Sequence, residues 1–208
     1  MLLAVLAVAS GAGAEPSAVS ADGRWQLQAQ GLELVLRDAS GVEARRWPTR
    51  AAQGGPASVV ATLRANPPRR SFVVGFEHLA EVWELLLDPA AEAQFSGLVH
   101  DYRMGEGLSE PGFLALRRTR LPEPVQALAL DRSGAWVLAR GADRPDGRAV
   151  LHLLQLDIRQ AAARFEVDAD PDLALTHDAP CGERDCLRVP DRRGGPPLQV
   201  DVRAARLR

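Results

Sequence analysis

The sequence has no lysine, few aromatic residues and only two cysteines. All 25 basic residues are arginine, and against 27 acidic residues they give a formal net charge of -2. This balance excludes a protein dedicated to binding nucleic acid or an anionic membrane, because such binders depend on clustered positive charge. The sequence also has no Gly-x-Ser-x-Gly, Walker or His-Glu-x-x-His motif, so no common hydrolase or nucleotide site is indicated.

Long hydrophobic runs are also missing, except at the start of the sequence. Residues 2–9 are apolar throughout and precede Ala12-Gly13-Ala14, a small-x-small site of the kind that signal peptidases cleave. About eight apolar residues are too few to span roughly 30 Å of hydrocarbon. We therefore predict a signal peptide over residues 1–14, a mature domain over 15–208, and a periplasmic protein without membrane attachment after cleavage.

The two cysteines, Cys181 and Cys186, enclose four polar residues. In an oxidising compartment such a pair predicts a disulfide that closes a tight loop. A metal site is the alternative, with His177 as a third ligand and Asp178 or Asp185 beside it. A single cysteine pair is a weak zinc signature. We therefore predict the disulfide and no metal.

Between these features, 18 glycines and 15 prolines divide the chain into short, β-like segments. One meander unit recurs: a tryptophan follows a turn glycine by two positions at Trp25 and Trp136, and the next strand ends at Asp38 and Asp157. Repeats of about 40–50 residues with several strands each are typical of propeller blades. The sequence therefore predicts an all-β fold, a partial β-propeller of about three to four antiparallel blades.

The expected blade units cover residues 20–48, 58–88 and 125–168. We expect one long loop insert over 89–124 and a C-terminal tail over 169–208. In the middle unit two patterns compete, because the apolar residues from Leu79 to Leu87 also have the spacing of an amphipathic helix. The repeat register favours a strand there, ending at Asp88.

Several segments resemble exported proteins of the haem-d1 propeller superfamily. They are Pro68–Phe76, Glu81–Leu85, Gly97–Arg103, Arg117–Thr119 and Pro124. The superfamily contains the propeller domain of cytochrome cd1 nitrite reductase and accessory proteins of haem-d1 assembly. The resemblance implies a β-propeller fold, a periplasmic address, a link to denitrification, and haem d1 or another tetrapyrrole as the ligand class.

The resemblance does not carry over the reductase's catalytic centre. Where the reductases place a distal histidine in a Leu-His-Asp-Gly segment, this chain has Gln126. The nearest match to their second distal histidine is His177, whose surroundings differ. No Cys-x-x-Cys-His motif is present to attach a c-type haem. We therefore predict no catalytic residue.

The expected insert carries the most reactive cluster of side chains. His100, Asp101, Tyr102 and Arg103 place an imidazole, a carboxylate, a phenol and a guanidinium next to one another. A histidine oriented by a neighbouring carboxylate can serve as a ligand, acid or base near neutral pH. The alternative is a hydrogen-bonded loop anchor. These four residues, with His177, are the candidate cofactor-binding residues.

Other polar groups have simpler interpretations. His152 lies among leucines and is expected to be a satisfied interior histidine, whereas His78 flanks a turn and is expected to be solvated. Three arginine groups could pair with tetrapyrrole carboxylates or with nearby acidic residues. They are Arg69-Arg70, Arg117-Arg118-Arg120 and Arg192-Arg193.

Three functions remain open. The first is a non-catalytic periplasmic binding or accessory protein that recognises a tetrapyrrole or a protein partner through the insert. The second is a haem-d1-dependent protein or assembly factor in nitrite reduction, and the third is a truncated propeller without activity. Propellers normally close with four to eight blades, and an open arc leaves edge strands unpaired. We therefore expect another propeller-bearing chain, or self-association through the open edges, as the partner.

Overall fold

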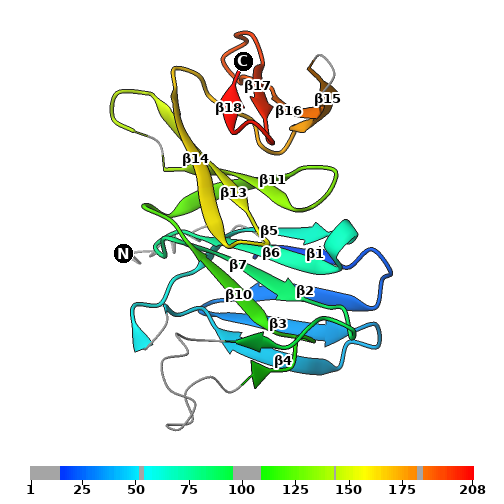
Figure 1. The fold of residues 1–208 in the computed structure, drawn as a ribbon. Coiled ribbons are helices and arrows are strands. Elements are labelled where there is room, and N and C mark those ends of the chain that lie inside the picture. The colour runs from blue at the N-terminus through cyan, green and yellow to red at the C-terminus, as the bar shows by residue number, and fades with distance from the viewer. Residues whose placement is uncertain (1–14, 52–53, 96–108, 143, 182–184) are drawn as a thin grey trace, which may run out of the picture.

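A computed structural model describes residues 15–51, 54–95, 109–142, 144–181 and 185–208. In this part of the chain there are four antiparallel sheets of four strands each and one two-stranded sheet (Figure 1). The predicted partial β-propeller of three to four blades is confirmed. The predicted signal peptide lies outside the described residues, and none of the described helices is long and apolar enough to cross a membrane.

The first blade begins the chain and follows the predicted repeat. Its strands are β1 (Ser17–Val19), β2 (Trp25–Gln30), β3 (Glu33–Asp38) and β4 (Glu43–Pro48). Trp25 opens the second strand and Asp38 closes the third, as the repeat predicted. The Asp38 carboxylate accepts hydrogen bonds from the backbone N–H groups of Ser40 and Val42, which explains why an aspartate ends the strand before this turn.

The second blade confirms the strand that the repeat register favoured. Its strands are β5 (Val60–Asn66), β6 (Ser71–Phe76), β7 (Glu81–Leu86) and β10 (Leu116–Arg120), with a short 3-10 helix, η2 (Pro67–Arg69), between β5 and β6. All residues of β7 are buried. A strand covered on both faces can carry apolar residues on either face, so the apolar residues of β7 do not alternate and their spacing resembles that of a helix.

Part of the expected insert belongs to the second blade. Strand β10 pairs with β7, for example Arg118 with Trp83 and Thr119 with Val82, so it is the outer strand of that blade. A small hairpin of β8 (Gln94–Phe95) and β9 (Ser109–Glu110) comes before it. The insert is therefore shorter than the predicted residues 89–124, because the arginine-rich segment Leu116–Arg120 forms a strand and not a loop.

The third blade matches its predicted unit, whereas the fourth was missed. The third has β11 (Val125–Leu130), β12 (Trp136–Gly141), β13 (Ala149–Gln155) and β14 (Gln160–Val167). The fourth has β15 (His177–Pro180), β16 (Asp185–Val189), β17 (Leu198–Asp201) and β18 (Arg206–Leu207). The expected tail over 169–208 is thus mostly a complete sheet, whose short strands carry no tryptophan to mark the repeat.

The blades lie one upon another in chain order (Figure 1), and an apolar layer fills each of the three interfaces. Leu34 of the first blade packs with Trp83 of the second, and Val82 of the second packs with Val137 of the third. Between the third and fourth blades, Leu151 packs with Leu187. Each inner blade therefore buries both faces, and each end blade buries one.

Candidate functional site

A pocket of about 290 Å³ lies where the first blade meets the second. It is called the Trp25–Phe113 pocket below. Its lining includes the aromatic rings of Trp25 and Phe113, the apolar Leu87, and the polar side chains of Arg24, Asn66 and Arg70. The pocket thus combines an apolar wall with two guanidinium groups at one blade interface.

The β1–β2 turn supplies the first side of the pocket. The Ser20 hydroxyl donates a hydrogen bond of 2.6 Å to the Asp22 carboxylate, and the backbone N–H of Trp25 donates one of 3.0 Å to the Ser20 hydroxyl oxygen. The Arg24 N–H also donates to Asp22, at 3.1 Å. The Ser20 hydroxyl, and after it the Arg24 N–H, hold the pKa of Asp22 below its usual value. The turn therefore presents Trp25 in a fixed position at the start of β2.

The connection between β5 and β6 supplies the second side. Arg70, the residue that follows η2 and caps it, has a left-handed backbone, φ +46°. This conformation costs energy for a residue with a Cβ. The Arg70 carbonyl oxygen accepts a 2.7 Å hydrogen bond from the N–H of Leu87. Its side chain, 70% exposed, lies 3.5 Å from the Asp88 carboxylate. The guanidinium therefore stays at the rim, open to solvent.

The base of the insert supplies the third side. The rings of Phe113 and Trp25 lie 6.1 Å apart at 57°, a favourable tilted aromatic contact. The next residue, Leu114, has a left-handed backbone, φ +61°, and packs against the apolar layer between the first two blades. At Gly112 an added Cβ would lie 2.2 Å from the carbonyl oxygens of Ala91 and Glu92. Only glycine fits there, and its close packing sets the position of Phe113.

This arrangement favours a ligand with a flat apolar body and a carboxylate. Aromatic and aliphatic walls bury apolar surface, while guanidinium groups form strong, charge-assisted hydrogen bonds to carboxylates. Among the described residues of the lining, Arg24 and Arg70 are basic and Asp22 is acidic. These described residues thus include one more positive than negative group.

Most of the predicted cofactor residues are not described by the structure. His100, Asp101, Tyr102 and Arg103 lie outside the described residues. Pro89 and Phe113, on the two sides of the segment that contains them, both line the Trp25–Phe113 pocket. His177 is exposed on β15 of the fourth blade, with its Nδ1 3.1 Å from the Leu175 carbonyl oxygen. It is not among the residues that line the pocket.

The arginine groups pair mainly with acidic residues. Arg69 contacts Glu84 at 2.7 Å and Asp157 at 2.6 Å. Arg118 lies 4.2 Å above the Trp83 ring and 3.7 Å from the Glu81 carboxylate. In the fourth blade Arg192 pairs with Asp172, and Arg193 with Asp168. The ion-pair interpretation of these groups is therefore favoured, and of the predicted arginines only Arg70 lines the Trp25–Phe113 pocket.

His152 is interior, as the sequence predicted, but only Nε2 has a hydrogen-bond partner among the described residues, and the buried Nδ1 has none. Its side chain is fully buried, and Nε2 lies 3.0 Å from Glu123 Oε1. Burial lowers the pKa of His152, and Glu123 opposes this effect in part. The role of His152 is therefore to join β13 to the segment that precedes β11.

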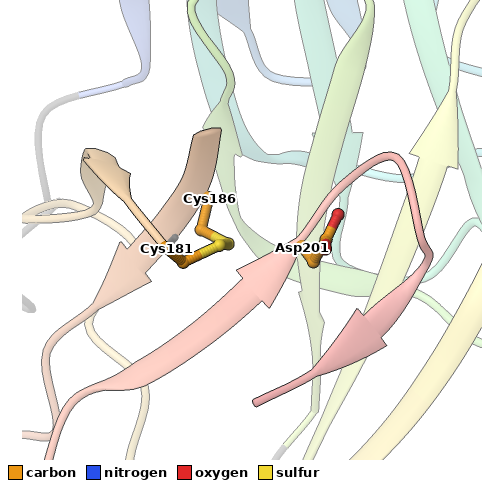
Figure 2. A group of neighbouring side chains, drawn as sticks. All are labelled: Cys181, Cys186 and Asp201. Carbon is orange, nitrogen blue, oxygen red and sulfur yellow. A yellow bond between two sulfur atoms is a disulfide. The ribbon is translucent and has the colours of Figure 1, made fainter. Parts of the chain in front are cut away.

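The predicted disulfide between Cys181 and Cys186 is present, with 5.8 Å between the Cα atoms. It lies on the face of the fourth blade that is turned away from the third, because Leu187 and Val200, which alternate with Cys186 and Asp201, face the third blade. The acidic group beside the disulfide is Asp201, and His177 is not part of this group (Figure 2).

The sequence missed the residues that form the pocket. In the sequence Trp25 marks only the repeat, and no pattern distinguishes Phe113 or Arg24. The repeat itself held the useful signal, because a tryptophan directly after the first turn of a blade lies at a blade end, where loops of neighbouring blades meet. The approach of Phe113 to Trp25 depends on the folding of the insert base, which no local pattern indicates.

The fold is a partial β-propeller, and a pocket lies between its first two blades. No protein-family model matches the chain. Over 86 residues, which are 40% of this chain and 17% of the relative, the sequence is 40% identical to dihydro-heme d1 dehydrogenase of Pseudomonas aeruginosa.

Solved structures show the same fold. NirN, a dihydro-heme d1 dehydrogenase in complex with DHE, superposes with a TM-score of 0.70 at 22% identity, over 92% of this chain and 36% of that chain. Apo AztD from Citrobacter koseri superposes with a TM-score of 0.54 at 12% identity, over 94% and 46%. This chain thus spans less than half of each of these proteins. The resemblance to the haem-d1 propeller superfamily is confirmed.

Proposed function

We propose that this protein is an exported, non-catalytic binding or accessory protein of the haem-d1 propeller type, and that it binds a carboxylate-bearing tetrapyrrole such as haem d1. The observation that carries the proposal is the Trp25–Phe113 pocket, which joins aromatic walls to two arginines in a chain similar to a dihydro-heme d1 dehydrogenase. The N-terminal apolar run and the disulfide support export to the periplasm.

The size of the pocket limits which part of the ligand it holds. About 290 Å³ is at the lower limit of small-molecule sites. The pocket therefore fits one edge of a tetrapyrrole, with a carboxylate at Arg24 or Arg70 and the ring against Trp25 and Phe113. The rest of the macrocycle would lie outside the pocket, and His100, which is outside the described residues, stays the candidate ligand that the sequence suggests.

Binding is proposed rather than catalysis because of the side chains in the pocket. Among the described residues that line it, none is histidine or cysteine, and these are the usual axial ligands and proton carriers of haem enzymes. Arginines and aromatic rings recognise a ligand and orient it. A carrier or assembly partner in denitrification agrees with this chemistry.

The partner in this proposal is a second copy of the chain. Four blades from each of two copies make eight, within the range of closed propellers. The outer face of the first blade carries Gln26, Gln28 and Arg37, which alternate with the buried Leu27 and Leu36. A partner would meet this face through polar contacts.

Light scattering at increasing protein concentration tests self-association, and a constant monomer mass would contradict it.

Absorbance titration tests tetrapyrrole binding. Purified protein is titrated with haem and, as a matched ligand, with the same macrocycle after its carboxylates have been esterified. We expect a saturable Soret shift with the free carboxylates and an affinity at least about tenfold lower with the ester, since charge-assisted hydrogen bonds are lost. Equal affinity for both ligands, or no saturable shift, would contradict the proposal. The same titration of His100→Ala reports whether the insert ligates the iron.

A further inference from the structure

The disulfide of the fourth blade has a buried carboxylate beside it. Cys186 and Asp201 face each other across the β16–β17 pair. Cys181, Cys186 and Asp201 are 6%, 1% and 0% exposed, respectively. The two sulfur atoms and a carboxylate oxygen all lie within 4.8 Å of one another (Figure 2). Because all three residues are buried, this cluster differs from the exposed groups of acidic residues that are common on protein surfaces.

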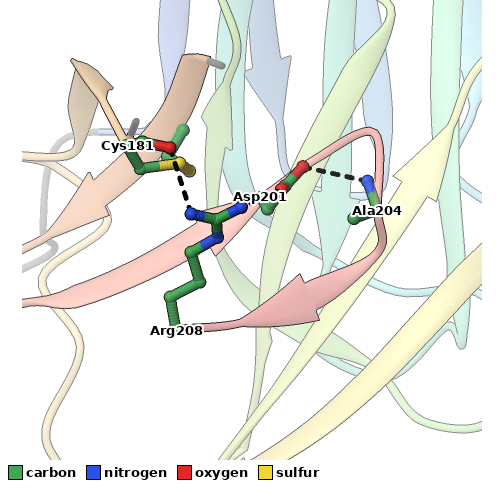
Figure 3. Close-up of a disulfide and its surroundings, with 5 residues drawn as sticks. Cys181, Asp201, Ala204 and Arg208 are labelled. Atoms are coloured by element: carbon green, nitrogen blue, oxygen red, sulfur yellow. Dashed lines mark hydrogen bonds and ion pairs between the residues drawn. A yellow bond between two sulfur atoms is a disulfide. The ribbon is translucent and has the colours of Figure 1, made fainter. Parts of the chain in front are cut away.

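Local hydrogen bonds hold this carboxylate in place. Asp201 accepts a 2.9 Å hydrogen bond from the Ala204 N–H, and its other oxygen lies 3.3 Å from the Arg208 guanidinium (Figure 3). Arg208 also donates a 3.1 Å hydrogen bond to the Cys181 carbonyl oxygen. A carboxylate has two oxygens with two lone pairs each, so a hydrogen-bonded carboxylate can also serve as a ligand of a cation.

We propose that reduction of the Cys181–Cys186 disulfide opens a binding site for a thiophilic divalent cation such as Zn²⁺, with both sulfurs and Asp201 as its protein ligands. A dithiol reductant gives two electrons and two protons to the disulfide and is itself oxidised to a disulfide. The S–S bond breaks and two thiols form. The cation then displaces one proton from each thiol, and water takes the fourth position.

The geometry and charge both suit such an ion. Two sulfurs bound at about 2.3 Å to a tetrahedral zinc lie roughly 3.8 Å apart, so the described cluster needs only small side-chain movements. Two thiolates and one carboxylate carry three negative charges, and a divalent cation offsets two of them. In the disulfide form the sulfurs carry no charge, and the Arg208 guanidinium lies beside the Asp201 carboxylate.

The third ligand differs from the one that the sequence suggested. His177 pairs through its backbone with Arg188 on β16, whereas Cys186 pairs with Ala179. His177 thus lies two residues before Ala179, the residue opposite Cys186, and its side chain is exposed. His177→Ala is therefore a matched control, since it removes a strong zinc ligand from the same hairpin without changing the proposed site.

The test uses the whole protein, with Zn²⁺ and Cd²⁺ as probes. The protein is reduced without denaturant by a phosphine reductant, and Zn²⁺ affinity is measured by competition with a chromogenic chelator. We expect stoichiometric binding to the reduced protein, at least about 100-fold weaker binding to the oxidised protein, roughly tenfold or greater loss in Asp201→Asn, and no change in His177→Ala. Cadmium NMR of the reduced wild-type protein counts sulfur ligands without any variant, and we expect two.

Three results would overturn the proposal. They are failure of the disulfide to reduce in the folded protein, equal Zn²⁺ affinity of the two redox forms, and loss of binding in His177→Ala with Asp201→Asn unchanged. Thermal unfolding provides a further check, because an ion bound at a folded site raises the Tm of the reduced protein. An unchanged Tm with bound Zn²⁺ would mean that the thiols bind the ion only when unfolded, and would also overturn it.

Discussion

Arg69 and Glu84 form an ion pair, 2.7 Å from Nε to Oε1, inside the interface between the second and third blades. The Glu84 side chain is 1% exposed, and it also accepts a 3.0 Å hydrogen bond from the Ser71 hydroxyl and lies 3.8 Å from the Arg117 guanidinium. Arg69 also reaches Asp157 of the third blade at 2.6 Å. One guanidinium therefore satisfies a buried carboxylate and joins two blades.

Removing the guanidinium should be costly. We expect Arg69→Met to lower the free energy of unfolding by roughly 3–5 kcal/mol, because it leaves the Glu84 carboxylate buried without its main partner. Urea unfolding measures the loss. The exposed Arg70, paired with Asp88, is the matched control, and Arg70→Met should change stability by less than about 1 kcal/mol. The double variant Arg69→Met/Glu84→Leu should recover most of the loss, and a double variant no more stable than Arg69→Met would refute this view of the pair.

Two turn glycines make a second comparison. Gly134 and Gly41 both have positive φ, +69° and +84°. An added Cβ at Gly134 would lie 2.1 Å from Asn66 Oδ1, whereas nothing lies within 4 Å of one at Gly41. We expect Gly41→Ala to cost about 1 kcal/mol from its backbone alone, and Gly134→Ala to cost about 1–3 kcal/mol more, from the clash.

Urea unfolding curves of the two alanine variants measure this difference in the free energy of unfolding. The Asn66 side chain donates a 2.9 Å hydrogen bond to the Gly134 carbonyl oxygen, so the Gly134 variant disturbs the contact between the second and third blades. Equal losses of unfolding free energy in the two variants would contradict the prediction, because they would show that the added methyl group at position 134 does not disturb this contact.

His152 should make stability depend on pH. Burial lowers its pKa below 6.5 in the folded protein, so between that lowered value and 6.5 the unfolded chain binds more protons. Stability is therefore full above pH 6.5 and decreases as the pH falls below it. Urea midpoints at pH values about one unit above and one unit below 6.5 should differ less for His152→Gln than for the wild type. A difference of the same size in both proteins would contradict the assignment.

The disulfide should stabilise the fourth blade modestly. Its cysteines are 5 positions apart, and closing so small a loop in the unfolded chain is worth about 2 kcal/mol. The Cys181→Ser/Cys186→Ser variant should lose this amount in chemical unfolding. Reduced wild-type protein without metal should be destabilised to a similar extent. A loss several times larger would mean that the pair also holds native contacts in place.

The blade repeat could be predicted because its markers have local causes. Asp38 caps the turn after it through hydrogen bonds to backbone N–H groups, so residue type alone reveals the strand end. The fourth blade has few such markers, since β18 has two residues and β15, at the opposite edge of the sheet, is mostly exposed. Its burial comes from Leu187 and Val200 packing on the third blade, a long-range contact that the local sequence does not encode.

The same limit applies to the site. Arg117, Arg118 and Arg120 resembled a basic loop, yet they form β10, where Arg118 covers Trp83. Whether an arginine faces a ligand or a buried carboxylate depends on strand pairing, which composition does not specify. The disulfide was predictable because its two ends are close in sequence. Its neighbour Asp201 was not, because it comes from another strand of the sheet.

Tetrapyrrole affinity of the Arg24→Gln/Arg70→Gln variant is the most direct measurement of the proposed function. The wild type, this variant and an Arg188→Gln control, altered on the exposed surface of β16, are titrated with haem d1 and followed by absorbance. Loss of charge-assisted hydrogen bonds predicts roughly 10- to 100-fold weaker binding by the pocket variant and wild-type affinity for the control. Equal affinity of all three proteins would contradict a tetrapyrrole site at the Trp25–Phe113 pocket.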